Sequence, residues 1–501
     1  MSEKNPPKSF WSIVKSLGPG MILTGSIVGS GELIATTKVG AEAGFWLLWI
    51  IILGCVIKVF TQLEFGRYTV AHNEPTLSAL NRVPGPRFKV NWVVWCWVIM
   101  TILIVSQLGG IVGGVGQALA MTKPLTEEGR QFNEAQNKLV DVKVQLALLK
   151  TRDKNHPDIP TVEKEIIKLS TNKLEEPYDA QIWAILIALF TSLMMWFGRY
   201  NFIKIFTTVL VVGFTFVTMV TLVLLQNTQW AVQGQDLTNG LSFSLPPVES
   251  SLTKAPLITA LAAFGIIGVG SAELIFYPYW CMKQGYAKSV GINDGSKNWI
   301  VRAKGWMKIM YIDAWVAMVV YTLSTIAFYL LGAAVLGRSG LNPEKGDLIR
   351  NLSEMYVPVF GEWAPTLFLI GAVAVLFSTF FVACDGSSRV ISDCFGLFGF
   401  HKNDEKDHSK WAKTISIIWP LLCLVVYLFI NAPAKMVLMS GVAQSIMLPI
   451  LGVSALFFRY KRCDKNLKPS AAFDFFLWLS VLAFALVGFY LLYDKLKMLY
   501  L

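Results

Sequence analysis

The chain has 501 residues, of which 54% are hydrophobic and 15% charged, and its mean hydropathy is +0.52. A soluble domain carries about 25% charged residues, and apolar runs of about 20 residues recur here, so the sequence indicates a polytopic helical membrane protein. The net charge of +11 does not indicate nucleic-acid binding, because Lys and Arg gather between the apolar runs. The seven cysteines form no CxxC or His/Cys cluster, which argues against a disulfide framework or a zinc site.

Eleven apolar runs predict eleven transmembrane helices. No cleavable signal peptide is expected, because Ser2–Lys15 is polar and basic and the first apolar run continues as a span. The predicted spans are Leu17–Thr36, Gly44–Phe65, Val93–Met121, Ile182–Phe197, Phe202–Leu225, Pro256–Met282, Met307–Leu336, Trp363–Cys384, Ile415–Ile430, Met436–Phe458 and Phe473–Tyr493.

The positive-inside rule assigns the two sides of these spans. Lys4, Lys8 and Lys15 place the N-terminus in the cytosol, whereas the loop Gln226–Lys254 carries a single Lys and falls outside. With eleven spans the C-terminus is expected outside, and the protein is expected in a bacterial-type plasma (inner) membrane. Five basic clusters fall on the cytosolic side: Arg67/Arg82/Arg87/Lys89, Arg199/Lys204, Lys283/Lys288/Lys297/Arg302/Lys304, Lys402/Lys406/Lys410/Lys413 and Arg459/Lys461/Arg462/Lys465.

A polar insertion, Thr122–Gln181, separates the third and fourth spans. Its segments Asn133–Lys150 and Pro160–Lys173 carry apolar residues at helical spacing, and His156–Pro160 has the composition of a turn. Acidic and basic residues nearly balance, so a solvated helical hairpin outside the membrane is expected. Two interpretations stay open: a docking element for a protein partner, and a plain solvent-exposed insertion.

A heptad that contains a glutamate occurs twice, at Val28–Ile34 and Val269–Ile275, with a single Gly-to-Ala difference. Each copy lies in an apolar run, where a charge costs about 2.5–3.5 kcal/mol on insertion scales. Glu32 and Glu273 therefore need a cation, a proton or a shared water cavity. The adjacent glycines weaken the helix locally, by about 1 kcal/mol each relative to Ala. The pattern predicts two broken helices that face one midplane site.

The two heptads lie in the first and sixth predicted spans, five spans apart, so the second heptad enters the membrane in the opposite direction and the repeat is inverted. The alternative, two unrelated Gly-Ser kinks, requires an intramembrane acid to recur by chance in near-identical surroundings. The chain is thus expected to form one transmembrane transporter domain over residues 1–501. It comprises repeat 1 at about 17–225, repeat 2 at about 256–458, an extra span at 473–493 and the hairpin insertion at 122–181.

The expected substrate or metal site combines the two heptads with an amide oxygen from a later span. Its residues are Gly29, Ser30, Gly31, Glu32, Gly270, Ser271, Ala272, Glu273 and Gln444. Lys58 is able to compensate a carboxylate charge, although a lysine can also snorkel to an interface. Asp313 is a further intramembrane acid considered for coupling. Asp385 and Arg389, spaced i,i+4, either pair with each other or take part in gating.

Several stretches resemble the Nramp family of divalent-metal transporters. Gly18–Trp49 matches the frame of that family's first helix, which opens with Gly-Pro, reaches a helix-breaking Asp-Pro-Gly-Asn and closes with Phe-Gly before Leu-Leu-Trp. The likeness continues through Gln62, Gly265–Gly268 and Ser440–Pro449 (SGVAQSIMLP). It covers most of the chain outside the insertion. The resemblance implies an all-α polytopic membrane protein with the LeuT-like (APC superfamily) inverted 5+5 repeat and broken helices 1 and 6.

The sequence departs from the family pattern at the metal ligands. The family's Asp-Pro-Gly-Asn falls on Gly29–Glu32, its Met-Pro-His falls on Ala272–Leu274, and its later histidine falls on Tyr279. A thioether selects soft metals, whereas carboxylates and water suit Mg²⁺, Ca²⁺ and Mn²⁺. The loss of the methionine, which resembles the magnesium-transporting branch, together with two acids indicates a hard ion. All four histidines lie outside the predicted spans.

The sequence therefore predicts a secondary transporter that moves a divalent cation such as Mg²⁺ or Mn²⁺ by alternating access. An alternative on the same fold is a transporter of an amino acid or other small organic solute. A second alternative is a sensor or scaffold that signals through the hairpin. No nucleotide-binding loop or catalytic Ser/His/Asp set is visible, so an enzyme is not expected. The expected partners are membrane lipid and the transported cation, with no resident cofactor and no nucleic acid.

Overall fold

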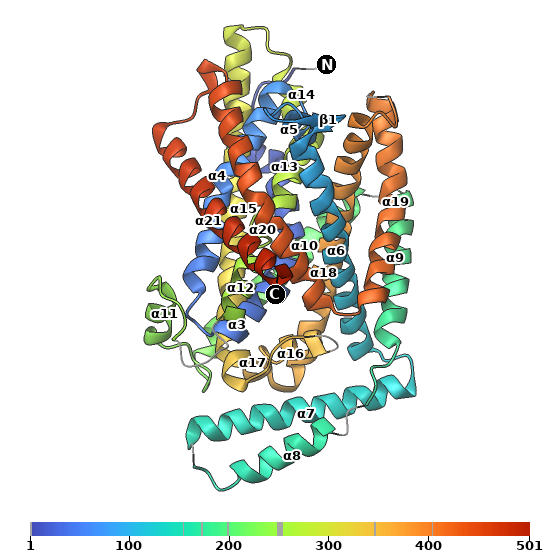
Figure 1. Ribbon diagram of the computed structural model, residues 1–501, viewed down its shortest axis with the longest axis vertical. Coiled ribbons are helices and arrows are strands. Elements are labelled where there is room, and N and C mark those ends of the chain that lie inside the picture. Colours follow the sequence, from blue (N-terminus) through green and yellow to red (C-terminus); the bar gives the residue numbers. More distant parts are fainter. Residues whose placement is uncertain are drawn as a thin grey trace.

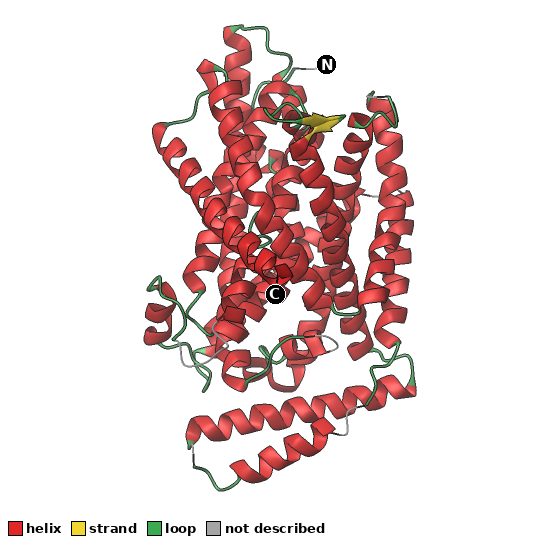
Figure 2. Ribbon diagram, viewed as in Figure 1, coloured by secondary structure: helices red, strands yellow, loops and turns green. Residues whose placement is uncertain are grey.

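The computed structural model describes residues 3–153, 155–171, 174–197, 200–247, 254–344, 347–402 and 404–500. Long helices stand side by side along the longest axis of the molecule, and a pair of helices lies across one end (Figure 1). Within the described ranges, the strands are β1 (Arg87–Phe88) and β2 (Val90–Asn91), a short antiparallel pair at the opposite end (Figure 2). All seven cysteines are free thiols.

The bundle consists of helices from the whole length of the chain. Its longer members are α2 (Pro19–Ile27), η1 (Val28–Thr36), α3 (Thr37–Ala43), α4 (Leu48–His72), α6 (Trp92–Thr122), α9 (Asp179–Phe197), α10 (Tyr200–Leu225), α12 (Lys254–Phe264), α13 (Ser271–Gln284), α15 (Lys297–Leu331), η2 (Gly332–Gly337), α18 (Ala364–Leu397), α19 (Glu405–Ile430), α20 (Pro433–Phe457), η5 (Phe458–Arg462) and α21 (Ala471–Tyr500). Shorter helices connect them: α1 (Phe10–Ser16), α5 (Thr76–Leu80), α11 (Gly234–Leu241), α14 (Tyr286–Val290), α16 (Leu348–Ser353), α17 (Val357–Phe360), η4 (Gly361–Trp363) and η6 (Lys465–Leu467).

Eight helices of the described chain are long and apolar enough to cross a membrane: Leu48–His72, Trp92–Thr122, Asp179–Phe197, Lys297–Gly337, Val357–Leu397, Lys406–Ile430, Pro433–Arg462 and Ala471–Met498. A ninth results if the helices Phe10–Ser16 and Pro19–Ala43, bent by 50°, count as one span. The apolar parts of α10 and α12 are shorter helices. The count of eleven spans therefore stays a prediction.

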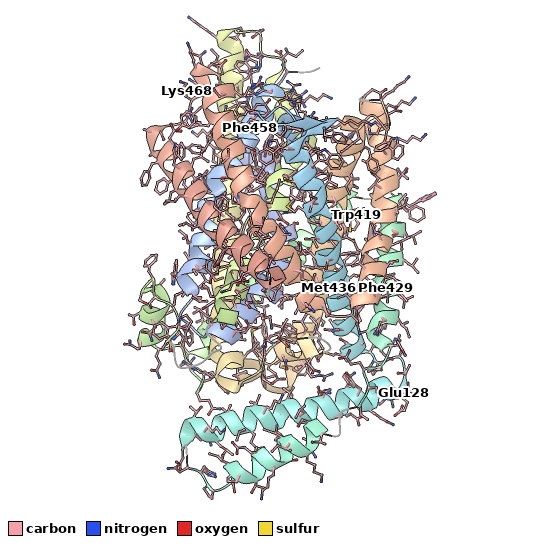
Figure 3. The ribbon with its side chains drawn as sticks, viewed as in Figure 1. Glu128, Trp419, Phe429, Met436, Phe458 and Lys468 are labelled. Carbon is pink, nitrogen blue, oxygen red and sulfur yellow. The ribbon has the colours of Figure 1, made fainter. Side chains whose placement is uncertain are left out.

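The outer helices of the bundle expose large apolar side chains. Phe429 on α19 is 86% exposed, whereas Met436 on α20 is fully buried. Lys468 and Glu128 lie toward opposite ends of the molecule (Figure 3). Exposed apolar side chains on long helices are the surface that a hydrocarbon layer requires.

The predicted cytosolic loops lie together at one end of the molecule. The N-terminus, α5, β1 and α14 gather there (Figure 1), and this end includes Arg87 in β1 and Lys288 in α14. Arg199, expected on the same side, lies outside the described residues, and Lys204 is described by its backbone alone.

The insertion forms a helical hairpin at the other end, composed of α7 (Glu127–Arg152) and α8 (Ile159–Thr171) (Figure 1). Thr126 caps α7 by accepting a hydrogen bond from the Gly129 amide at 2.9 Å. The ion pair Lys150–Glu163, at 2.8 Å, joins the two helices. The predicted second helix extends to Lys173, which lies outside the described residues.

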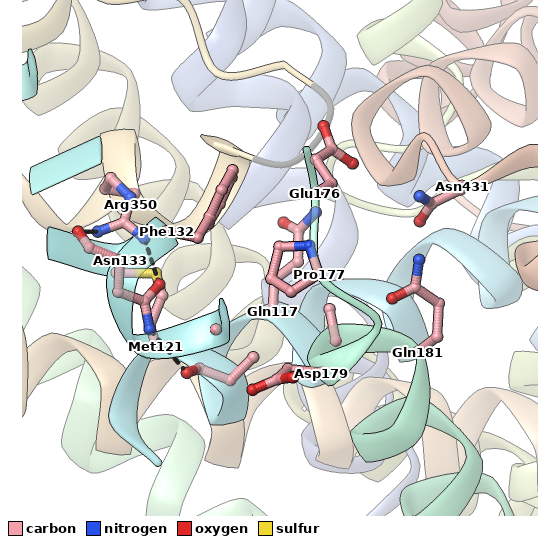
Figure 4. A pocket seen from close by; sticks show the side chains of 13 residues that line it. Gln117, Met121, Phe132, Asn133, Glu176, Pro177, Asp179, Gln181, Arg350 and Asn431 are labelled. Carbon is pink, nitrogen blue, oxygen red and sulfur yellow. Dashed lines mark hydrogen bonds between the residues drawn. The ribbon is translucent and has the colours of Figure 1, made fainter. Parts of the chain in front are cut away.

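Two buried charged side chains attach the hairpin to the bundle around a small pocket (Figure 4). Arg350 of α16 is 3% exposed and donates to the Oδ1 of Asn133 at 2.6 Å and to the Oδ1 of Asn137. Asp179, at the start of α9, accepts from the amide of Thr126 at 3.1 Å and from its hydroxyl at 2.7 Å. The hairpin therefore contacts α16, which lies between α15 and α18 in the chain.

Candidate functional site

The first glutamate heptad adopts a π-helix, η1. The predicted discontinuity of the first span thus takes the form of a widened turn in which the chain remains helical. The hydroxyl of Thr36 donates to the carbonyl of Gly31 at 2.9 Å and supports the widened turn. π-helical segments occur frequently at functional sites. This segment places Glu32 in the interior, where its side chain is fully buried.

Two glycines of η1 allow neighbouring segments to approach closely. A Cβ atom at Gly29 would collide with the hydroxyl of Thr379 in α18. A Cβ atom at Gly31 would lie 2.9 Å from the carbonyl oxygen of Ile266. The position at which the Nramp pattern has its aspartate therefore has no room for a side chain in this structure.

The second heptad lies at a real interruption of a helix. α12 ends at Phe264, α13 begins at Ser271, and the intervening segment 265–270 is not helical. Gly268 has φ +55°, a left-handed conformation that favours glycine. Glu273 lies in the first turn of α13 and is 6% exposed. The interruption leaves backbone groups in the interior of the bundle without helical partners.

Glu32 reaches across to this unwound segment. Its Oε1 accepts a hydrogen bond from the amide of Gly268 at 3.2 Å and another from the hydroxyl of Thr325 in α15 at 3.0 Å. Its Oε2 has no hydrogen-bond partner among the described residues. One oxygen thus fixes the side chain, and the other is available to a ligand.

Glu273 contributes to a cluster of three oxygen atoms at Gly270. A Cβ atom at Gly270 would lie 2.5 Å from Glu273 Oε2, 2.9 Å from Gln444 Oε1 and 3.0 Å from the carbonyl oxygen of Gly265. Glu273 Oε2 has no hydrogen-bond partner in the described chain, and its Oε1 accepts weakly from Ser26 at 3.5 Å. A carboxylate, an amide and a backbone carbonyl therefore converge on a space that only a glycine leaves open.

Both glutamates contact the unwound segment. Glu32 contacts Gly268 and Glu273 lies against Gly270, and residues two apart are separated by at most about 7 Å. Glu273 and Gln444 lie together at Gly270, and the inclusion of Glu32 in one site with them stays a prediction. No group of three His, Cys, Asp or Glu side chains lies together within the described ranges. Any cation here would depend on amide and backbone oxygens as well as carboxylates.

Gln444 is held in place by a network that links the four helical elements α20, α6, η1 and α13. Its amide nitrogen donates to Gln107 Oε1 at 2.7 Å, and Gln107 donates to the hydroxyl of Ser30 at 3.0 Å. Gln444 Oε1 also accepts from the amide of Ala272 at 3.1 Å, and its carbonyl accepts from the hydroxyl of Ser271 at 2.6 Å. The network fixes the amide oxygen toward Glu273.

The other ionisable residues that the sequence singles out lie in three different places. Lys58 is fully buried and contacts the unwound segment. Asp313 accepts from the amides of Gly18, at 3.0 Å, and Gly20, so it caps the start of α2. Asp385 and Arg389 form an ion pair at 2.9 Å, which confirms the i,i+4 pairing.

Two residues of this arrangement were not predicted as site residues from the sequence. Thr325, which holds Glu32, is one of several hydroxyl residues in a long apolar helix and carries no distinguishing pattern. The carbonyl of Gly265 belongs to a residue without a side chain. Gln107 forms hydrogen bonds between helices, because it donates to Ser30 and accepts from Gln444.

A cavity lies further along α13 from the break. It measures about 570 Å³ and is lined in part by Tyr279, Asp393 and His408. Tyr279 donates to Asp393 Oδ2 at 2.5 Å, and the imidazole of His408 lies 2.6 Å from Asp393 Oδ1. Tyr279 therefore lines a cavity, and its hydroxyl binds an acid of α18.

Apolar helices that surround a broken helix with buried acids define an integral membrane protein of the transporter class. Solved structures share the arrangement. The manganese transporter of Eremococcus coleocola is 16% identical with a TM-score of 0.58, and the alignment covers 97% of this chain and 88% of that chain. MhsT, in complex with L-phenylalanine, is 13% identical with a TM-score of 0.56, covering 98% of this chain and 99% of that chain. These likenesses show the LeuT fold.

The family follows from the sequence match. Residues 168–494 match the family described as Natural resistance-associated macrophage protein-like, so the chain belongs to the Nramp family. A protein of Pasteurella multocida (strain Pm70), PM0681, is 22% identical over 460 residues, which are 88% of this chain and 84% of that protein. Both the resemblance to Nramp and the LeuT-like fold that the sequence predicts are confirmed.

Proposed function

We propose that the protein is a secondary transporter of a divalent metal cation, which binds between Glu32 and Glu273 and crosses the membrane by alternating access. The observation that carries the proposal is the convergence of Glu273 Oε2, Gln444 Oε1 and the Gly265 carbonyl on one space. Glu32, whose Oε1 binds Gly268 of the same unwound segment, has an unpaired Oε2 among the described residues. Membership of the Nramp family, and a fold shared with a manganese transporter, support a metal ion as the cargo.

The proposed cargo is a hard ion such as Mg²⁺ or Mn²⁺. All donors at the site are oxygens, and Ala272 occupies the place of the family's thioether. Carboxylate, amide and carbonyl oxygens suit Mg²⁺, Ca²⁺ and Mn²⁺, and Mg²⁺ in particular retains part of its water. Because three protein oxygens and one further carboxylate oxygen are fewer than six ligands, the bound ion keeps some water.

An organic solute fits the charges less well. The α-carboxylate of an amino acid would bind at the N-terminus of a half-helix. Here the first turn of α13 carries Glu273, and Glu32 lies against the same segment. Two acids repel a carboxylate, so a metal cation is the better match.

The orientation follows the distribution of basic residues. We place the N-terminus and the loops gathered with it in the cytosol, and the C-terminus and the α7–α8 hairpin outside, in a bacterial-type plasma membrane. The cavity at Tyr279 then lies on the path from the site to the cytosol, and the hairpin lies at the outer end.

The test is cation uptake by the purified protein in liposomes, with Mg²⁺, Mn²⁺, Ca²⁺ and a panel of amino acids. Glu32→Gln and Glu273→Gln are each expected to lower divalent-cation uptake at least about tenfold. Both variants should keep or raise the melting temperature, because a buried charge is removed. Glu42→Gln, further along the same span and paired with Lys38, is the matched control and should transport normally.

Two outcomes would reject the proposal. Unchanged uptake in both single variants would show that the acids do not bind the cargo. Saturable uptake of an amino acid, without uptake of any divalent cation, would favour the organic-solute alternative.

A further inference from the structure

Lys58 lies in the middle of α4 with its side chain fully buried. Its ammonium donates to the carbonyl oxygen of Ile267 at 2.7 Å and to that of Phe264. The ammonium also lies 4.7 Å from the centre of the Phe264 ring. Since an ammonium has three donors and two of them point at carbonyls, this lysine is fixed in the bundle and does not extend to an interface.

The carbonyls that Lys58 binds mark the C-terminal end of a half-helix. α12 ends at Phe264, where the interruption removes the partners that a continued helix would supply. The C-terminal end of a helix carries partial negative charge, and unwound carbonyls at broken helices commonly coordinate monovalent cations in transporters. Without the ammonium, two buried carbonyl oxygens would lose their partner.

Four features favour a positive charge at this position. Two are the carbonyl oxygens and the aromatic ring of Phe264. The other two are the acids Glu32 and Glu273, which contact the same unwound segment as Lys58. Gly268, which binds Glu32, follows Ile267 directly in the chain. The ammonium therefore binds the carbonyls of Phe264 and Ile267, whereas the carbonyl of Gly265 belongs to the oxygen cluster at Gly270.

We propose that Lys58 is a built-in monovalent cation, which occupies the carbonyl end of the broken helix permanently. The carbonyls of Phe264 and Ile267 are then closed to ions from solution. The transported cation, as proposed above, is restricted to the oxygen cluster at Gly270. Its transport requires neither Na⁺ nor K⁺. Lys58 is a positioning residue in this scheme, because it acts through the backbone of the break and the two acids.

The experiment removes the ammonium and supplies a soluble replacement. Lys58→Ala leaves a space beside the two carbonyls and is expected to lower divalent-cation uptake at least about tenfold. Ammonium, methylammonium, K⁺ or Na⁺ should restore uptake in a saturable manner, whereas the native protein should not respond. A merely structural role for the lysine would not produce rescue by a monovalent cation.

A second readout does not depend on transport. The melting temperature of detergent-solubilised Lys58→Ala should rise saturably with at least one of these four ions, at constant ionic strength set by choline chloride. Lys58→Gln, whose amide can donate to the carbonyls without a charge, provides a second variant if the alanine variant does not fold. It should fold and show no dependence on monovalent cations.

The control is Lys38→Ala, which removes another buried lysine. Lys38 pairs with Glu42 and with Glu344, at 2.8 and 2.9 Å, and contacts no carbonyl of the α12 break. Its loss should not be repaired by any of the four ions. A Lys58→Ala protein that transports normally, or one that no monovalent cation stabilises or restores, overturns the inference. If rescue appears in the melting temperature but no divalent cation is transported, the inference stands and the proposed cargo is wrong.

Discussion

Glycine at position 270 is as important to the proposed site as the acids beside it. The backbone of Gly270 has φ −67° and ψ 171°, which alanine adopts without strain. A methyl group there would nevertheless lie among Glu273 Oε2, Gln444 Oε1 and the Gly265 carbonyl. Glycine is therefore required at position 270 by the lack of space for a side chain, and not by the backbone conformation.

Gly270→Ala is therefore expected to weaken divalent-cation binding at least about tenfold without preventing folding. Gly213→Ala is the matched control, because a Cβ atom at Gly213 meets nothing within 4 Å. Isothermal titration with Mn²⁺ measures the affinity of both variants for the ion. Equal affinity in the two variants and the native protein would show that the oxygen cluster does not hold the ion.

Ala272 allows a test of selectivity. The residue stands where the Nramp pattern has a methionine, and its amide binds Gln444 Oε1. We expect little preference for Mn²⁺ over Mg²⁺ and weak Cd²⁺ binding, and Ala272→Met should raise Cd²⁺ affinity because a thioether suits soft metals. Isothermal titration of the native protein and of Ala272→Met with Mn²⁺, Mg²⁺ and Cd²⁺ tests both expectations. Sub-micromolar Cd²⁺ binding by the native protein, unaffected by the substitution, would place the metal site elsewhere.

At the residue scale, the sequence shows which charged side chains are candidates for the site. It does not show which hydroxyl and backbone groups lie beside them. Glu32 and Glu273 are conspicuous because hydrocarbon penalises a charge wherever it lies. Thr325 and the Gly265 carbonyl become visible only when the break brings them beside the acids. Asp313 shows the opposite case, since an intramembrane acid caps a helix there.

Among the elements, the hairpin and the short helix α16 are joined by one guanidinium. Arg350→Ala would leave acceptors on Asn133 and Asn137 without their donor, and a hydrogen bond from a charged group contributes about 1.5–3 kcal/mol. We expect faster amide hydrogen exchange in α7. Arg130→Ala, which removes an arginine that is 63% exposed, should leave the exchange unchanged. Unaltered protection of α7 in Arg350→Ala would contradict this attachment.

The same junction contains an acid with a pH-dependent contribution. Burial, together with the Asp141 carboxylate on α7, raises the pKa of Glu354 to about 7. In the unfolded chain this carboxyl ionises near its ordinary value of 4.5, so folding takes up a proton between the two values. The contribution of Glu354 to the unfolding free energy is full below about pH 4.5, falls as the pH rises through 7 and is constant above that.

The melting temperature is thus expected to fall between pH 5 and pH 8 by more in the native protein than in Glu354→Gln. Glutamine keeps the neutral form at every pH, so its variant should show the flatter profile. Parallel profiles for the two proteins would show that Glu354 ionises normally in the folded state.

The two glutamate helices show how far a local pattern determines an element. Glycine and serine predict a weakened helix in both heptads, and the second is interrupted at 265–270. The first becomes a π-helix, because the chain there keeps backbone and hydroxyl hydrogen bonds while it packs against α18 and Ile266. Helix propensity alone does not predict whether such a helix is interrupted or becomes a π-helix, because tertiary contacts decide between the two.

For the whole molecule, hydropathy and the repeated heptad are sufficient to predict a polytopic membrane transporter with an inverted repeat. The LeuT-like fold and the Nramp family come from the resemblance of stretches such as Gly18–Trp49 and Ser440–Pro449 to that family. The hydropathy signal is strong because the bilayer restricts spanning segments to long apolar helices. The attachment of the hairpin to α16 through Arg350 was not predicted, because the contact joins segments that are remote in sequence. The same holds for Lys58, whose carbonyl partners lie on a different helix.

The most direct test of the central claim is to locate the ion. Crystals grown with Mn²⁺ should show an anomalous peak next to Glu273, Gln444 and Glu32, with oxygen distances of about 2.0–2.6 Å or one intervening water. The same peak should vanish in Glu273→Gln crystals. A strong peak elsewhere, such as in the cavity beside Asp393, with none between the two glutamates, would contradict the account.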